Sequence, residues 1–150
     1  MHAPATFSSK QARDTMAGEP SVVESLAAAR AADLAFVGIG SPAHGSSAAL
    51  LASMDLSPEE EKEFWAAVPT GDVAARYFNS SGQAIHGAVE DHVLAISLAD
   101  LIAIPNVVGV ATGRAKANAL LGAMRGQIID SLVCDESLAR AVLTNSEADS

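Results

Sequence analysis

The sequence predicts an α/β fold, in which helices flank a mostly parallel β-sheet and a β-hairpin is attached. Three apolar runs of strand length, at residues 33–40, 106–111 and 128–134, are typical of parallel strands buried on both faces. Apolar residues with helical spacing fill much of the chain between them. A helix-length segment separates the last two runs, so these strands should be parallel, with a right-handed connection.

The N-terminal part of the chain is expected to be helical. One helix should span residues 8–17, opened by Ser8 or Ser9, and a second should begin at Glu19-Pro20, because proline suits the first helical position. Residues 45–56 are less clear, with a possible helix over 48–54. The residues of the second helix expected to face the core are Val22, Val23, Leu26 and Ala29 or Arg30.

The segment Ser57-Pro58-Glu59-Glu60 is a helix start with a capping box. Phe64, Trp65 and Val68 should turn inward, and Pro69 and Gly71 should end this helix.

A hairpin is expected from residues 72–78 and 83–89, joined by the turn sequence Asn79-Ser80-Ser81-Gly82. Its second arm would carry His86, Glu90 and His92 on one face. Two imidazoles and a carboxylate can bind a metal, but plain polar surface is the favoured interpretation, and we expect neither a metal nor a cofactor.

The end of the chain adds three helices and a tail. Ser97 should cap a short helix that ends at Ile102, and Gly126 should stop the helix after the second strand. Asp135 should cap the last helix. That helix should bury Leu138, Val142 and Leu143, and residues 145–150 are expected to fray.

The most informative stretch is the turn between residues 106–111 and the following helix. Gly113 permits a tight turn and close approach to a ligand, while Arg114 and Lys116 stand in the first turn of the helix. Cations there oppose the helix dipole, and a phosphate would relieve that conflict. The alternative is that both are solvated surface residues. The spacing is not that of a P-loop. The inward stripe is Ala117, Leu120, Leu121 and Met124.

A second glycine-containing turn follows the first strand, at Gly38-Ile39-Gly40-Ser41-Pro42. The third glycine is out of register, so a dinucleotide site is rejected. The turn nevertheless lies at the carboxyl end of a parallel strand, where open α/β sheets bind their ligands.

Composition excludes several classes of protein. A net charge of −9, with scattered cations, argues against nucleic-acid binding by this chain alone. The sequence shows neither a signal peptide nor an apolar run long enough to span a membrane. The single cysteine, Cys134, fits a reducing cytoplasm and is interpreted as a small core residue.

Four ordered motifs together resemble one family, the sugar-binding effector domain of SorC/DeoR-type bacterial transcriptional regulators. The motifs are Asp33 to Gly40, Thr70 to Val73 with Arg76-Tyr77-Phe78 and Gly82, Ile104 to Gly113 with Lys116-Ala117, and Leu132 to Glu136. They cover residues 33–143, and residues 4–32 look similar to the helices that precede them in the family.

The resemblance implies a fold like that of glucosamine-6-phosphate deaminase and ribose-5-phosphate isomerase. It also implies a sugar or phosphosugar effector that changes how the intact protein binds DNA. Lys116 matches the lysine that contacts the ligand phosphate, beside Gly113, and Asp72 matches an acid that holds sugar hydroxyls. Gly38, Gly40 and Ser41 would line the mouth of the cleft.

Three departures from the family pattern qualify this expectation. A DNA-reading domain and the family's first strand, with its ligand loop, are both expected to be missing, so residues 1–150 would form a single partial effector domain. The alternatives are a truncated gene product and a fragment that pairs with itself to cover the open edge of the sheet, and a homo-oligomer is expected. Residues 40–56 contain no lysine or arginine, so at most one phosphate should be bound strongly.

The alternative function is a sugar-phosphate isomerase or deaminase, with Asp72 as general base. It lacks a convincing second acid or base, since His44 and His86 are more simply loop or surface residues.

Overall fold

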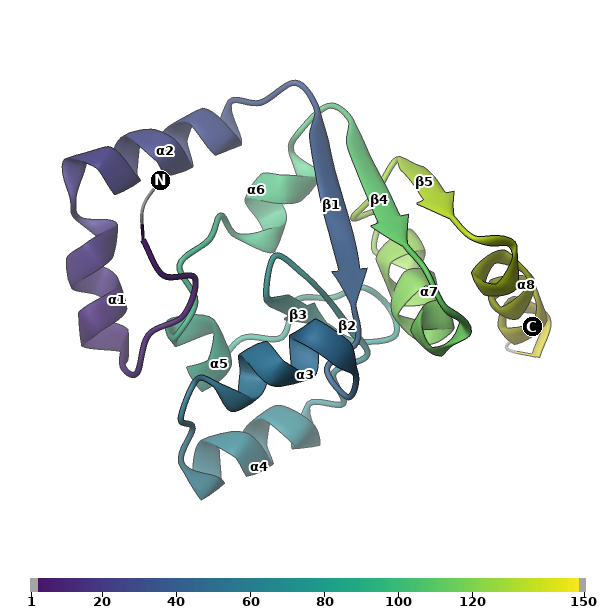
Figure 1. Ribbon diagram of the computed structural model, residues 1–150, viewed down its shortest axis with the longest axis horizontal. Helices are drawn as coiled ribbons and strands as arrows, with labels where there is room; N and C mark the ends of the chain where they lie inside the picture. Colours follow the sequence, from purple (N-terminus) through teal and green to yellow (C-terminus); the bar gives the residue numbers. More distant parts are fainter. Residues whose placement is uncertain (1–2, 149–150) are drawn as a thin grey trace.

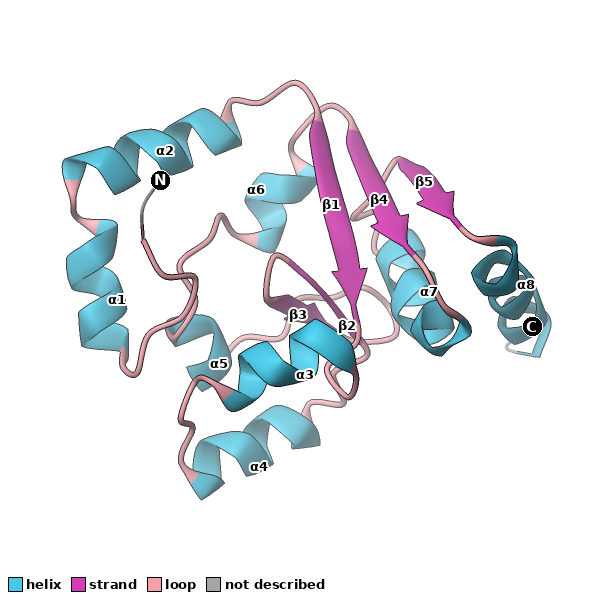
Figure 2. Cartoon of the chain, viewed as in Figure 1, coloured by secondary structure: helices cyan, strands magenta, loops and turns pink. Residues whose placement is uncertain are grey.

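The structure, a computed structural model, describes residues 3–148. Its strands form one five-stranded sheet, with helices on both sides (Figures 1 and 2). The strands are β1 (Ala35–Gly40), β2 (Gly71–Val73), β3 (Arg76–Phe78), β4 (Val107–Ala111) and β5 (Ser131–Cys134). The helices are α1 (Lys10–Ala17), α2 (Pro20–Arg30), α3 (Gly45–Ala52), α4 (Pro58–Ala66), α5 (Ala88–Asp91), α6 (Leu98–Ile102), α7 (Ala117–Arg125) and α8 (Glu136–Ala148), with a 3₁₀ turn, η1 (Arg114–Lys116).

The strand order is β3-β2-β1-β4-β5, with β1, β4 and β5 parallel. Val37, Gly109 and Leu132 stand in one row across these three strands, which confirms the predicted parallel core of the fold. β2 and β3 continue the sheet as an antiparallel hairpin, with β2 antiparallel to β1. In Figure 1, β1 and β4 therefore point their carboxyl ends to the same edge of the sheet.

Two apolar cores lie on opposite faces of the sheet. The larger core packs α7 and α8 against all five strands, around residues such as Phe78, Leu120 and Leu138. The smaller core lies over the hairpin and joins it to α3 and α4 through Tyr77, Met54 and Phe64. The ring of Phe64 meets that of Tyr77 edge-on, with centroids 4.9 Å apart.

The parallel strands are buried on one face only, so the prediction that they are covered on both faces was wrong. Phe36 is 70% exposed, Val110 40% and Val133 57%, and the register places all three on the face opposite α7. Figure 1 shows this face of β1 and β4 toward the reader, with α7 behind. Within residues 3–148, only the end of β1 has a helix over this face, namely α3. We call the surface of Phe36, Gly38, Val108, Val110, Ser131 and Val133 the open sheet face.

The hairpin differs from the predicted one. β2 and β3 together span residues 71–78, and so cover the whole of the expected first arm, and their turn is Ala74-Ala75, where both residues have positive φ, 51° and 60°. Neither glycine nor asparagine marks this turn, so turn chemistry could not locate it. The expected second arm makes a single bridge, Phe78 to Ala84, and then enters α5.

Helix starts were predicted more accurately than helix faces. The side chains of Ser9, Ser57 and Ser97 cap α1, α4 and α6, the latter two with complete capping boxes. α3 begins at Gly45 rather than at residue 48. α8 continues to Ala148, so the expected tail is helical as far as the structure describes it.

Several side chains expected to face inward are exposed. They are Val23 (51%), Trp65 (42%), Val68 (70%), Met124 (48%) and Leu143 (66%). Val22, Phe64, Leu120, Leu138 and Val142 are buried as predicted. Cys134 packs partly buried against the larger core. None of the helices in residues 3–148 is long and apolar enough to cross a membrane.

Candidate functional site

The candidate site is centred on the pairing of Gly40 with Asp72, where the end of β1 meets β2. A Cβ atom on Gly40 would collide with the Ser47 hydroxyl and with Oδ1 of Asp72. Gly40 is therefore required for close approach rather than for an unusual backbone angle. Its missing side chain lets two polar side chains meet over the end of the strand.

Asp72 is a buried carboxylate with an unsatisfied oxygen. Only 6% of the residue is exposed, and Oδ1 has no hydrogen-bond partner in the described part of the chain. Burial raises the pKa of Asp72 above its ordinary value, because a low-dielectric environment disfavours the charged form. The Ser47 hydroxyl, the Ala75 backbone and the Lys116 ammonium act in the opposite direction, each with a smaller effect.

Lys116 approaches the site from the turn after β4. Gly113 has φ 91° and ψ 133°, a conformation that suits glycine, and η1 then carries Lys116 to the N-terminus of α7. Lys116 thus occupies the N-cap position of α7, without a side-chain capping hydrogen bond, whereas the sequence predicted that it would stand inside the first turn. The ammonium is close enough to lower the pKa of Asp72, and no hydrogen bond or ion pair engages it among residues 3–148.

The Gly113 turn is fixed by Asp135, which follows β5. Its Oδ2 accepts a hydrogen bond from the backbone N–H of Gly113 at 2.7 Å, while Oδ1 accepts one from Leu138 N–H at 2.9 Å. Asp135 therefore caps α8, as predicted, and also ties the ends of β4 and β5 together. The Ser137 hydroxyl, followed by these two N–H groups, lowers the pKa of Asp135 to about 2.

The structure brings only part of the predicted site together. Gly40 and Asp72 are paired directly, Lys116 acts on Asp72 through its charge, and Ser41, 9% exposed, continues directly from β1. Gly38 lies on the open sheet face, and a Cβ atom placed on it would have no atom within 4 Å. Arg114 is exposed in η1, and no contact joins it to Asp72 within the described residues.

Sequence reasoning missed Ser47. It belongs to the first turn of α3, is 7% exposed, and lies beside the Asp72 carboxylate. The only sequence signal was a serine in a region read as an uncertain helix. Its importance depends on the pairing of β1 with β2, which the sequence did not indicate.

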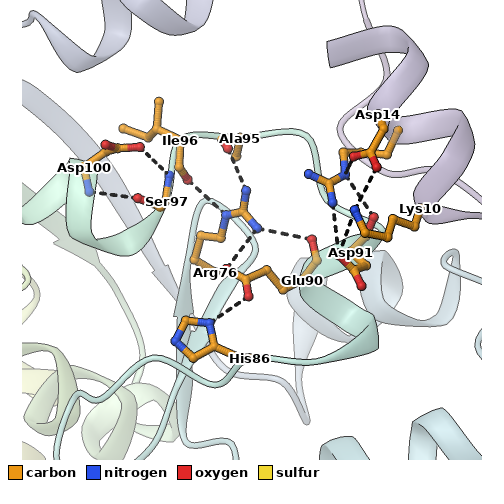
Figure 3. A network of polar contacts seen from close by, with 11 residues as sticks. Lys10, Asp14, Arg76, His86, Glu90, Asp91, Ala95, Ile96, Ser97 and Asp100 are labelled. Carbon is orange, nitrogen blue, oxygen red and sulfur yellow. Dashed lines mark hydrogen bonds and ion pairs between the residues drawn. The ribbon is translucent and has the colours of Figure 1, made fainter. Parts of the chain in front are cut away.

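The metal alternative is not supported in the region that the structure describes. His86 pairs with Glu90 at 2.8 Å, as Figure 3 shows, but the Nδ1 of His92 is used by the carbonyl oxygen of Phe7. No cluster of potential metal ligands occurs among residues 3–148. Glu90 instead faces Arg76, whose guanidinium donates to the carbonyl oxygens of Ile96 and Ala95 (Figure 3).

Comparison with known proteins places this geometry in a family. Residues 1–144 match the family model described as "Putative sugar-binding domain". Over 142 residues the chain is 35% identical to the transcriptional regulator LsrR of an Enterobacter species, covering 94% of this chain and 44% of that protein. The chain therefore spans less than half the length of this curated relative.

Solved structures agree. A DeoR family transcriptional regulator from Listeria monocytogenes has a TM-score of 0.82 at 27% identity, over 94% of this chain and 56% of that one. The full-length sorbitol operon regulator SorC from Klebsiella pneumoniae has a TM-score of 0.81 at 26% identity, over 96% of this chain and 46% of that one. Fold, motifs and relatives coincide, and the chain belongs to the sugar-binding domain family of SorC/DeoR-type transcriptional regulators.

Proposed function

We propose that this chain senses a sugar monophosphate on behalf of a transcription regulator. The observation that carries this proposal is the unpartnered Oδ1 of the buried Asp72 carboxylate, which the Lys116 ammonium attracts. An unsatisfied buried acceptor costs roughly 1–3 kcal/mol. The hydroxyl of a carbohydrate is a suitable donor for it.

The phosphate end of the ligand is assigned to Lys116. An ammonium at the start of a helix, beside a glycine turn, suits a phosphate. Residues 40–56 offer no second cation, and Arg114 has no contact with Asp72. One phosphate is therefore the most that the site holds strongly.

The signal is a population shift. The ligand favours the arrangement in which Asp72 accepts its hydroxyl, and the first turn of α3, which lies over Asp72, responds. In an intact regulator this bias passes to a DNA-reading domain outside this chain, through the contacts of a homo-oligomer. A ligand shifts such an equilibrium only by its difference in affinity for the two arrangements.

The test is a thermal-shift experiment with a panel of sugar monophosphates, ribose 5-phosphate and glucosamine 6-phosphate included. A ligand at 100 times its Kd should add about 2.7 kcal/mol, which raises Tm by roughly 5–10 °C. Lys116→Ala should abolish the rise, while Lys62→Ala, an exposed lysine on α4, should retain it. The absence of any shift across the panel would count decisively against the proposal.

The enzyme alternative gains no support from the geometry. Asp72 would need a second acid or base nearby, yet His44 is an exposed residue before α3 and His86 pairs with Glu90. We therefore propose binding without turnover. Following product from ribose 5-phosphate and glucosamine 6-phosphate checks this, and product formation above the buffer rate would contradict it.

A further inference from the structure

Ser47 is a buried polar residue that the proposed ligand contacts do not use. It lies in the first turn of α3, and its hydroxyl and Asp72 Oδ1 crowd the one space where Gly40 lacks a side chain. Any side chain at position 40 would separate these two oxygens. The missing Cβ of Gly40 thus makes the contact between Ser47 and Asp72 possible.

The surroundings hold Ser47 in this place. The Tyr77 hydroxyl donates a long hydrogen bond, 3.5 Å, to the backbone carbonyl oxygen of Ser47. Tyr77 is 3% exposed and stands opposite Asp72 on β3, with its ring against Phe64. The same hairpin therefore presents the carboxylate and anchors the turn that covers it.

The chemistry of the pair is a donor beside an acceptor. Asp72 Oδ1 has no hydrogen-bond partner within residues 3–148, and its lone pairs can accept the Ser47 hydroxyl as well as a ligand hydroxyl. A serine hydroxyl rotates freely and can donate to a carboxylate, and hydrogen bonds to charged groups are the stronger kind. We propose that Ser47 is a positioning residue of the ligand site, whose hydroxyl keeps the Asp72 carboxylate charged and oriented for the hydroxyl groups of a carbohydrate. This inference rests on the proposed function and adds the residue on which the binding competence of Asp72 depends.

Other charged groups around Asp72 are few. Lys116 faces it from η1, and Tyr77 faces it from β3. Burial and the Asp72 charge both raise the pKa of Tyr77, so the phenol stays neutral in the range of interest. A change in the titration of Asp72 after removal of the Ser47 hydroxyl is therefore attributable to that hydroxyl.

The first experiment needs no ligand. NMR titration of ¹³C-labelled aspartate carboxyls, with Asp72 assigned from Asp72→Asn, gives the pKa of Asp72 in the whole chain. Ser47→Ala should raise it by about one pH unit. Ser46→Ala, at an exposed neighbour on α3, should leave it unchanged, and Ser47→Thr, which keeps the hydroxyl, should restore it.

The second experiment adds the sugar monophosphate that gives the largest thermal shift. The affinity for this sugar monophosphate should fall about tenfold for each pH unit below the pKa of Asp72. In Ser47→Ala, the pH at which the affinity begins to fall should be higher, by the same amount as the pKa of Asp72 rises in the NMR titration. A purely structural role would lower Tm without moving this pH profile.

The outcomes separate the two claims. An unchanged Asp72 titration in Ser47→Ala overturns the positioning role, whether or not a sugar binds. If Ser47→Ala changes the Asp72 titration but the wild-type protein binds no sugar monophosphate, the proposed sugar site is overturned and the positioning role is not. A moved titration with an unmoved binding profile overturns the link between Ser47 and the ligand.

Discussion

The hairpin and the parallel strands are parts of one sheet with opposite relations to solvent. Every residue of β2 and β3 is buried, including Asp72 and Arg76. In β5, by contrast, Ser131, Leu132 and Val133 are exposed, and β4 alternates between buried and more accessible positions. The difference arises because α3 and α4 cover the second face of the hairpin, whereas the open sheet face has no comparable cover within residues 3–148.

This difference shows that the apolar content of a strand does not determine whether helices cover both of its faces. The most apolar runs of the sequence form the less covered strands, whereas the short segment Gly71-Asp72-Val73 forms a fully buried one. Coverage is supplied by other elements, here the helices α3 and α4, so it cannot be inferred from the strand itself. The fully covered region is also the one that holds the unsatisfied carboxylate, which is where a ligand has the most to contribute.

The largest expected contrast is between two phenylalanines. Phe78→Ala removes a fully buried ring of the larger core and should cost about 3–5 kcal/mol of unfolding free energy. Phe36→Ala removes a ring that is 70% exposed and should change stability by no more than about 0.5 kcal/mol. Urea denaturation measures both. Equal losses would mean that the open sheet face is covered in solution.

A second contrast uses two glycines of β1. Gly40→Ala places a methyl group against Ser47 and Asp72 and should cost about 1–3 kcal/mol. Gly38→Ala meets no atom within 4 Å and should gain up to about 1 kcal/mol, because alanine loses less backbone freedom on folding. Thermal unfolding of the two variants side by side checks this, and a harmless Gly40→Ala would contradict the close approach at the site.

Asp72→Asn should trade function for stability. Folding raises the pKa of Asp72, so the folded state binds the carboxyl proton of Asp72 more tightly than the unfolded state does. Stability is therefore lost as pH rises from the unfolded-state pKa of this carboxyl to its higher folded-state pKa. The amide cannot ionise, so the variant should be more stable at pH 7 by about 1–2 kcal/mol, with the gain shrinking toward pH 4. It should also lose the sugar response. Comparing Tm across pH tests the sign, and a variant less stable at pH 7 would show that the charge is compensated.

The smallest effect concerns the hairpin turn. Ala74 is exposed and has φ 51°, a region that asparagine tolerates better than alanine. Ala74→Asn should therefore stabilise the protein by roughly 0.5 kcal/mol. Chemical denaturation resolves such a difference, and a loss of stability would show that the turn contributes through contacts rather than backbone strain.

Patterns that act locally predicted most of the fold. Capping by Ser57 and Ser97, the parallel runs and the Gly113 turn all depend on neighbours in sequence, and all are present. The turn at Ala74-Ala75 was missed because alanine carries no turn signal. Ser47 was missed because its partner, Asp72, is brought to it only by the pairing of β2 with β1.

The hydrogen bond from Gly113 to Asp135 has a consequence for how an anion is held. The glycine amide at this turn donates to the Asp135 carboxylate, so this N–H group is not available to the phosphate that we propose Lys116 binds. Asp135 also begins α8. A shift of α8 would therefore also move the turn that precedes Lys116, which connects this helix to the proposed phosphate position.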